Sequence, residues 1–138
     1  MTKHQGNTSP YTPMRNADLQ EAFRRVISNE PYIDLMDALA KTVKQPARRF
    51  YVSEERAFHR IRIMMRRFDV PIQLNARDRM FREILARVKK MREEQPHLSL
   101  RAVVWRVIRQ PAPEFYLTPE SAKVILSLMR NKEYDNTH

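Results

Sequence analysis

The stretch QPARRFYVSEERA, residues 45–57, returns 65 positions later as QPAPEFYLTPESA, residues 110–122. Each copy has a proline first, then two adjacent aromatic residues, and then a serine or threonine with a glutamate two positions later. Proline ends helices because it lacks the backbone N–H, whereas a hydroxyl residue before acids is typical of a helix start. Both stretches are therefore predicted to be the same helix-to-helix connection, with Phe50 and Phe115 anchoring it in the core.

The similarity extends on both sides of this connection. With an offset of 65 positions, residues 22–66 align with residues 87–131 without a gap. Prolines, the aromatic pair and a methionine coincide, and conservative pairs such as Val43 with Ile108 fill the positions between them. We therefore predict an internal duplication. Two units are few for a solenoid, so a single compact, pseudo-symmetric helical domain is expected.

Each repeat is predicted to contain three helices. Apolar residues recur at the i, i+3, i+4 spacing of an amphipathic helix in two segments before the proline and in one segment after the aromatic pair. Asp34 and Ser99 are expected to cap the second helices, and Ser53 and Thr118 the third. The sequence has one glycine, Gly6, and almost no runs typical of strands. The fold class is therefore predicted to be all-α, with negligible sheet.

The predicted organisation along the chain has four parts. The two tandem three-helix units span residues 16–70 and 71–133, and they are expected to pack together as one domain. Residues 1–15 and 134–138 are expected to be flexible tails, and the N-terminal one is polar.

The charge of the chain favours a polyanionic partner. Its 138 residues carry a net charge of +10, and the pI is near 10.4. Between Lys44 and Arg92 there are 15 lysines or arginines against five acids, so this segment accounts for the whole net charge. Nucleic acid is the commonest partner of so basic a surface, although a membrane surface, a ribosome-like assembly or an acidic protein fits the same charge.

Other patterns bear on location and redox chemistry. No apolar run approaches the roughly 18 residues that span a membrane. Residues 1–18 lack the apolar stretch of a signal peptide. We therefore expect a cytoplasmic protein. Cysteine is absent, which excludes disulfides and cysteine-based metal sites.

Patterns of catalytic or metal-binding residues are close to absent. The single glycine excludes glycine-rich phosphate loops, and the four histidines are scattered without a pair at i, i+4. Glu54, Glu55 and Glu120 fall in predicted first turns, where they suit the helix dipole without a catalytic role. We therefore expect no enzyme activity, no cofactor, no metal and no small-molecule substrate.

The predicted third helix of the first repeat has an apolar arc and an opposite basic arc. Compensating glutamates at i, i+4, which a merely solvated helix usually has, are missing from the basic arc. The second repeat loses this charge, since Val124 and Ile125 stand at the positions of His59 and Arg60. The basic arc therefore favours a phosphate backbone as ligand over a solvated face or an acidic protein, which stay open. Its members are Arg56, His59, Arg60, Arg62, Arg66 and Arg67.

The leading hypothesis is a small nucleic-acid-binding protein without catalytic activity, with double-stranded DNA as the favoured ligand. A transcriptional regulator and a nucleoid- or phage-type accessory protein both fit, and DNA against RNA is left open. The three-helix unit invites comparison with a helix-turn-helix, but its connection from Pro46 to Val52 is about twice the usual length. The candidate nucleic-acid-binding residues are Arg48, Arg49, Arg56, Arg60, Arg62, Arg66, Arg67, Lys89 and Lys90.

A second hypothesis is a helical interaction or assembly adaptor with an acidic protein partner. It depends on the third helix of the second repeat, which has a wide apolar arc in place of the basic one. This arc is expected to pack against the first repeat or against another copy of the chain in a homo-oligomer. Its members are Val124, Ile125, Leu126, Leu128 and Met129.

Overall fold

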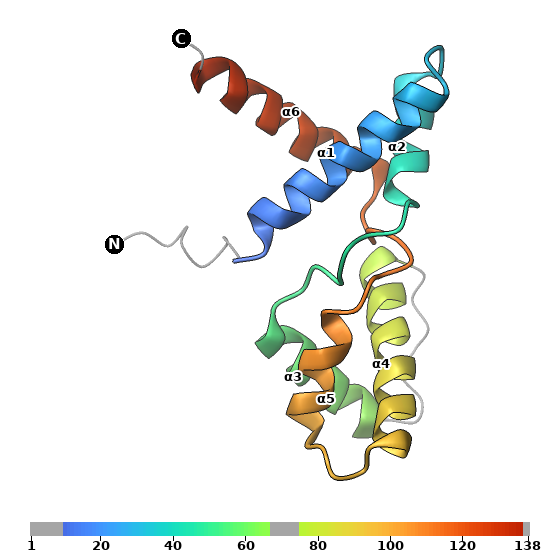
Figure 1. Cartoon of the computed structure of the whole chain (residues 1–138), viewed down its shortest axis with the longest axis vertical. Coiled ribbons are helices and arrows are strands. Elements are labelled where there is room, and N and C mark those ends of the chain that lie inside the picture. The colour runs from blue at the N-terminus through green and yellow to red at the C-terminus, as the bar shows by residue number, and fades with distance from the viewer. Residues whose placement is uncertain (1–9, 67–74, 137–138) are drawn as a thin grey trace. The chain divides into compact units, whose positions relative to one another are not determined.

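Helices build the part of the chain that the structure describes. The computed structural model describes residues 10–66 and 75–136, with side chains described as far as residue 131. Within these ranges it has no strand, and the predicted all-α fold class is confirmed. The helices (Figure 1) are α1 (Thr12–Asn29), α2 (Leu35–Val43), α3 (Glu54–Arg66), α4 (Ala76–Glu94), α5 (Leu100–Ile108) and α6 (Pro119–Asn136).

The caps that the sequence predicts are present at the starts of four helices. Asp34 and Ser99 accept hydrogen bonds from backbone N–H groups two and three residues later, both at 3.1 Å. The hydroxyls of Ser53 and Thr118 accept from N–H groups three residues later, at 3.2 and 3.1 Å. Each bond satisfies a donor that the first helical turn leaves without an intrahelical partner.

Two helices extend into the predicted tails. α1 begins at Thr12, inside the predicted tail of residues 1–15. Pro13 lies in its first turn, where the missing N–H of proline costs nothing and the fixed φ suits a helix. At the other end α6 runs to Asn136, past the predicted boundary at residue 133. The tail boundaries differ because polar composition alone does not mark where a helix starts or ends.

The six helices divide into two compact units. The central unit, residues 48–112, contains α3, α4 and α5, and each of these helices packs on the other two. The terminal unit, residues 1–47 and 113–138, contains α1, α2 and α6, which pack in the same way. This grouping differs from the contiguous units 16–70 and 71–133 that the sequence predicts. α3, the third helix of the first predicted repeat, packs on α4 and α5, the first two helices of the second repeat. In the same way α6, the third helix of the second repeat, packs on α1 and α2 of the first.

Two backbone hydrogen bonds support this exchange of third helices. The N–H of Phe50, just before α3, donates to the carbonyl oxygen of Ile108 at the end of α5 (3.0 Å). The N–H of Phe115, just before α6, donates to the carbonyl oxygen of Val43 at the end of α2 (3.0 Å). Helical periodicity shows which face of a helix is buried but not which neighbour covers it. The sequence pattern therefore does not reveal the exchange.

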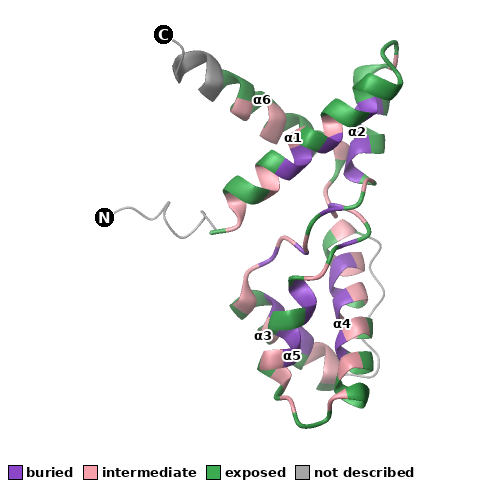
Figure 2. Ribbon diagram, viewed as in Figure 1, coloured by how far each residue is buried: buried purple, intermediate pink, exposed green. Residues whose placement is uncertain are grey.

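Each unit has its own apolar core (Figure 2). In both, the phenylalanine that comes just before α3 or α6 is buried as predicted, since Phe50 is 0% exposed and Phe115 is 5% exposed. Other core residues of the central unit include Val52, Ala57, Ile61, Met80, Phe81, Ile84, Val88, Val103, Val104, Val107, Ile108 and Ala112. Those of the terminal unit include Leu19, Ala22, Val26, Ala38, Leu39, Val43 and Ala122.

The helix bounds follow the predicted offset of 65 residues at several points. α2 and α5 have the same length, and they begin and end 65 residues apart. The last residues of α1 and α4 have the same separation. The duplication itself stays a prediction, because shared bounds describe the present fold and not its origin.

Candidate nucleic-acid interface

The two units differ in charge. The central unit has 17 lysines or arginines and seven acids, whereas the terminal unit has nine of each. The whole net charge of +10 therefore belongs to the central unit. A polyanion would be attracted to this unit and not to the other.

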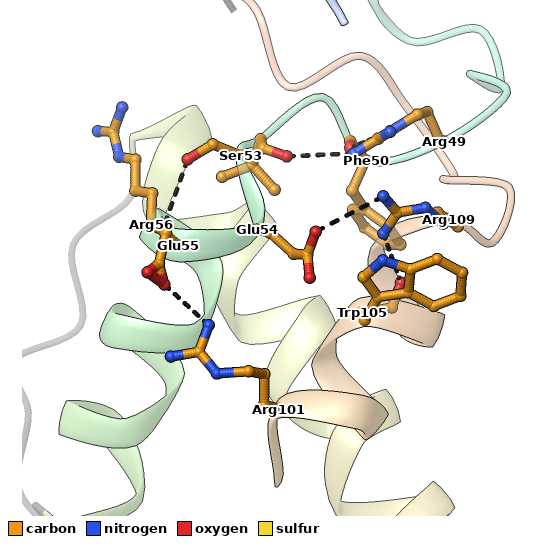
Figure 3. A network of polar contacts seen from close by, with 10 residues as sticks. Arg49, Phe50, Ser53, Glu54, Glu55, Arg56, Arg101, Trp105 and Arg109 are labelled. Carbon is orange, nitrogen blue, oxygen red and sulfur yellow. Dashed lines mark hydrogen bonds and ion pairs between the residues drawn. The ribbon is translucent and has the colours of Figure 1, made fainter. Parts of the chain in front are cut away.

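The two glutamates in the first turn of α3 are bound by Arg101 of α5 and by Arg109, the residue that follows α5 (Figure 3). A carboxylate oxygen of Glu55 accepts a hydrogen bond from Arg101 (2.8 Å). A carboxylate oxygen of Glu54 lies 3.7 Å from a guanidinium nitrogen of Arg109. The hydrogen bond and the positive charge of Arg101 lower the pKa of Glu55. The sequence predicts only a dipole role for these acids, and the structure adds a link between α3 and α5.

Both arginines also lie against aromatic rings. The guanidinium carbon of Arg101 lies 4.1 Å from the centroid of the Phe58 ring, and that of Arg109 lies 4.0 Å from the Trp105 ring. Both are cation–π contacts. Arg109 also donates a hydrogen bond to the carbonyl oxygen of Trp105 (3.0 Å). Because α5 engages the first-turn acids of α3, these acids do not neutralise the basic arc.

Most of the basic arc lies at the surface of α3. Arg56, His59, Arg62 and Arg66 are exposed. The apolar arc of the same helix is turned toward α4 and α5, as its buried alanine and isoleucine show (Figure 2). Arg67, the last predicted member of the arc, lies outside the described residues. The exposed members are therefore placed to meet a large ligand.

The two arginines of the connection before α3 differ in what they do. Arg48 is exposed. Arg49 is half-buried and donates hydrogen bonds to the carbonyl oxygens of Phe50 (3.0 Å) and Val52 (3.2 Å). Loop carbonyls outside regular structure need such donors. Arg49 therefore stabilises the connection, a role that its sequence pattern does not predict.

Arg60 lies at a hollow between α3 and the start of α4, with a volume of about 410 Å³. Its Nη2 atom is 3.2 Å from Oδ1 of Asp78, and its guanidinium carbon lies 5.7 Å from the centroid of the Phe81 ring. This member of the basic arc is therefore already paired with an acid. The other basic residues that line the hollow are Arg56, His59 and Arg77.

The two predicted lysines lie on the exposed side of α4. Lys89 lines a second hollow, of about 340 Å³, together with Met65 and Arg92. Since Met65 is in the last turn of α3, the structure brings Lys89 to the C-terminal end of that helix. Lys90 is exposed but is not among the residues that line this hollow.

Some basic residues of α4 that are not among the predicted nucleic-acid-binding residues lie beside α3 or make internal contacts. Arg77 and Arg92 line the two hollows beside α3. Arg87 instead donates to the carbonyl oxygen of Pro111 (2.9 Å), and its guanidinium carbon lies 4.9 Å from the Phe50 ring. Basic residues recur along this helix, and they are Arg77, Arg79, Arg82, Arg87, Lys89, Lys90 and Arg92. Which of them face α3 depends on packing. No sequence signal therefore separates them.

Similarity to known proteins does not identify the site, because no family model, no curated protein and no solved structure matches the chain. Among the described residues, no histidines and acids are grouped as a metal ion would require. None of the helices in the described ranges combines the length and apolar character needed to cross a membrane. The candidate site is therefore defined by its charge and geometry.

Proposed function

We propose that the protein binds double-stranded DNA through the basic arc of α3 and the adjoining basic residues of α4, as a binding protein and not as an enzyme. The observation that carries this proposal is the segregation of charge. The central unit holds a net charge of +10, and the terminal unit, built from a similar set of helices, holds none. Charge needed only for solubility would be mixed in sign and spread over both units.

The exposed arginines of the arc suit contacts with phosphate groups. Arg56, Arg62 and Arg66 are exposed along α3, and Lys89 lies near its C-terminal end. Guanidinium groups bind phosphate oxygens through two parallel hydrogen bonds. Each phosphate that is neutralised releases counterions, so the affinity is expected to fall steeply as salt is raised.

Contacts of this kind favour an accessory role over sequence-specific regulation. Phosphate contacts position a protein on the duplex but do not read its bases. Arg49 and Arg60, two members of the predicted set, are already engaged by loop carbonyls and by Asp78. We therefore place a nucleoid- or phage-type accessory protein ahead of a transcriptional regulator.

A mobility-shift assay with matched charge reversals tests the proposal. The wild-type protein is expected to shift duplex DNA at about 50 mM salt. Arg56→Glu with Arg62→Glu is expected to weaken binding roughly 100-fold, because two charge-assisted contacts of about 1.4 kcal/mol each are lost. Arg24→Glu with Arg25→Glu is the matched control, since both arginines are exposed on α1 of the terminal unit. It changes the net charge by the same amount.

The possible outcomes separate the hypotheses. Equal losses in the two double variants would assign binding to net charge and not to the basic arc. Tighter binding of RNA than of duplex DNA would keep the surface and change the ligand. If neither nucleic acid is shifted, the proposal is contradicted. Binding of polyglutamate in place of nucleic acid would then favour the adaptor with an acidic protein partner.

As a second candidate function, we propose self-association through α6. Val124 and Leu128, one turn apart on this helix, are 58% and 63% exposed. The same unit has a hollow of about 570 Å³ lined by Phe23, Leu39 and Leu126 among others. Exposed apolar features of this kind are typical of contact surfaces. Because the terminal unit has no net charge, two copies would not repel each other there.

Light scattering over a range of protein concentrations tests self-association. A dimer that Val124→Lys with Leu128→Lys converts to a monomer would support it. A monomer at every concentration would contradict it. Mobility shifts measured with the same double variant then show whether DNA binding needs the dimer.

A further inference from the structure

The hollow between α3 and the start of α4 concentrates positive charge. Among the described residues, three arginines and one acid, Asp78, line it. Arg56 and Arg60 lie one turn apart on α3, and Arg77 comes from the first turn of α4. A volume of about 410 Å³ is more than ten times the roughly 30 Å³ that one water occupies in the liquid. A small hydrated anion therefore fits.

Arg60 is held in place at this hollow but is incompletely satisfied. Asp78 binds one of its terminal nitrogens at 3.2 Å, and its guanidinium carbon lies 5.7 Å from the centroid of the Phe81 ring. Its Nε atom is buried and has no hydrogen-bond partner among the described residues. An arginine has five N–H donors, and a buried donor without an acceptor is costly. Because Nε is closed to solvent, an anion in the hollow would meet the terminal nitrogens of Arg60, whose side chain is 43% exposed.

We propose that this hollow is a seat for one phosphate group, bound by Arg56, Arg60 and Arg77, and that Asp78 competes with the phosphate for Arg60. Arginines that converge from two helices suit a tetrahedral anion with several oxygens. That the natural ligand is a phosphate of the DNA backbone rests on the proposed function. Inorganic phosphate is also a tetrahedral anion with several oxygens, so the same arginines would bind it. The start of α4 is not the basis of the seat, since Asn75 already caps it by accepting from the N–H of Asp78 (2.8 Å).

Three changes have distinct expected effects on phosphate affinity. Arg77→Ala weakens binding about tenfold, because it removes one charge-assisted contact. Arg56→Ala with Arg77→Ala weakens binding by less than the product of the single effects, since both arginines bind the same group. Asp78→Asn strengthens binding several-fold, because Arg60 loses its competing carboxylate while the residue keeps its size.

The full-length protein is titrated in two arms, with inorganic phosphate and with a short DNA duplex. The phosphate arm follows the arginine Nε–H signals and the backbone amides at the start of α4 by ¹H–¹⁵N NMR. The duplex arm follows fluorescence anisotropy. Arg82→Ala is the matched control, because this exposed arginine lies on α4 and does not line the hollow. Circular dichroism checks that each variant keeps its helices.

The seat is supported if Arg77→Ala binds phosphate and duplex more weakly than Arg82→Ala does, and if Asp78→Asn binds both more tightly than the wild type. If the wild type binds the duplex but Arg77→Ala and Asp78→Asn behave like Arg82→Ala, the seat is overturned and the proposed function stands. A third outcome is that phosphate shifts the NMR signals of residues at the hollow in the wild type but not in Arg77→Ala, while the duplex does not bind. The seat then stands and the proposed function fails. Binding in neither arm overturns both.

Discussion

The central and terminal units each consist of three helices that pack on one another, but the side chains on their surfaces differ. In each, the phenylalanine that comes just before α3 or α6 is buried, and its N–H donates at 3.0 Å to the carbonyl oxygen of the last residue of another helix of the same unit. In the central unit this phenylalanine precedes a helix with an exposed basic arc, and in the terminal unit it precedes one with exposed apolar residues. The residues that cap and anchor the helices are therefore shared by the two units, whereas the residues that give each surface its charged or apolar character differ.

The third helices show this difference most directly. α3 has exposed His59 and half-buried Arg60 where α6 has Val124 and Ile125. Its first-turn acids bind Arg101 and Arg109. In the terminal unit the position that corresponds to Arg101 holds a methionine, so α6 has no equivalent of that ion pair. The first-turn acids of α3 thus make contacts inside the central unit, and most of its basic arc is exposed.

The largest expected effect comes from removing the shared anchor. Phe50→Ala and Phe115→Ala should each lower the free energy of unfolding by about 3–5 kcal/mol, because each leaves a large cavity in its unit. The guanidinium of Arg87 also lies over the Phe50 ring, so part of the cost at this position is the loss of that contact. Urea unfolding followed by circular dichroism measures both.

Tyr32→Ala is the control for this pair, because Tyr32 is 99% exposed. It should change the free energy of unfolding by no more than about 0.5 kcal/mol. A cost as small as this for Phe50→Ala or Phe115→Ala would show that the connection is not anchored by its phenylalanine.

A smaller effect distinguishes the tyrosines that follow the two phenylalanines. Tyr116 has a φ of 56°, and it is the only non-glycine residue in the described ranges with positive φ. Such a conformation costs a bulky residue about 1 kcal/mol or more, and glycine avoids this cost. Tyr116→Gly should therefore be about 1 kcal/mol more stable than Tyr116→Ala, whereas Tyr51→Gly should be less stable than Tyr51→Ala. Thermal unfolding of the four variants checks the order, and the same order at both positions would contradict it.

The smallest effect concerns pH. Arg101 lowers the pKa of Glu55 below its ordinary value in the folded protein. The pair therefore contributes stability above the ordinary glutamate pKa, and this contribution is lost as the pH falls through the lowered pKa. Glu55→Gln should lower the melting temperature slightly near pH 7, because the pair is largely exposed. The difference from wild type should vanish in strong acid.

Glu120→Gln is the matched control for this effect, since Glu120 occupies the same position in the first turn of α6. The position opposite it that corresponds to Arg101 is Met36. Glu120→Gln should therefore give a pH-dependent difference smaller than that of Glu55→Gln. An equal difference at both positions would show that the helix dipole, and not Arg101, is the source of the effect.

Local signals made the helices predictable. Prolines that end α2 and α5, and hydroxyl or acidic caps before four of the helices, act within a few residues and can be read directly. The exchange of α3 and α6 could not be predicted, because it depends on which apolar faces meet after long connections form. The predicted start of α1 was too late because Pro13 was assigned to the tail and not to a first turn.

The candidate site divides in the same way. The exposure of Arg56, Arg62 and Arg66 follows from their spacing opposite the apolar arc. The structural role of Arg49 could not be predicted, because its acceptors are loop carbonyls whose positions depend on the connection. The position of Arg77 at the hollow depends on how α4 packs beside α3. Charge can therefore be predicted from sequence, whereas the partner of each charge cannot.

The salt dependence of duplex DNA affinity measures whether the basic arc of α3 neutralises phosphates of the backbone. The triple variant Arg56→Ala, Arg62→Ala and Arg66→Ala should reduce the slope of log affinity against log salt concentration by about 2.7, if each arginine neutralises one phosphate. The terminal-unit variant Arg24→Ala, Arg25→Ala and Arg130→Ala removes the same charge from exposed positions and should leave the slope unchanged. Equal changes of slope in the two variants, or no change in either, would contradict the claim that the basic arc of the central unit binds the phosphate backbone.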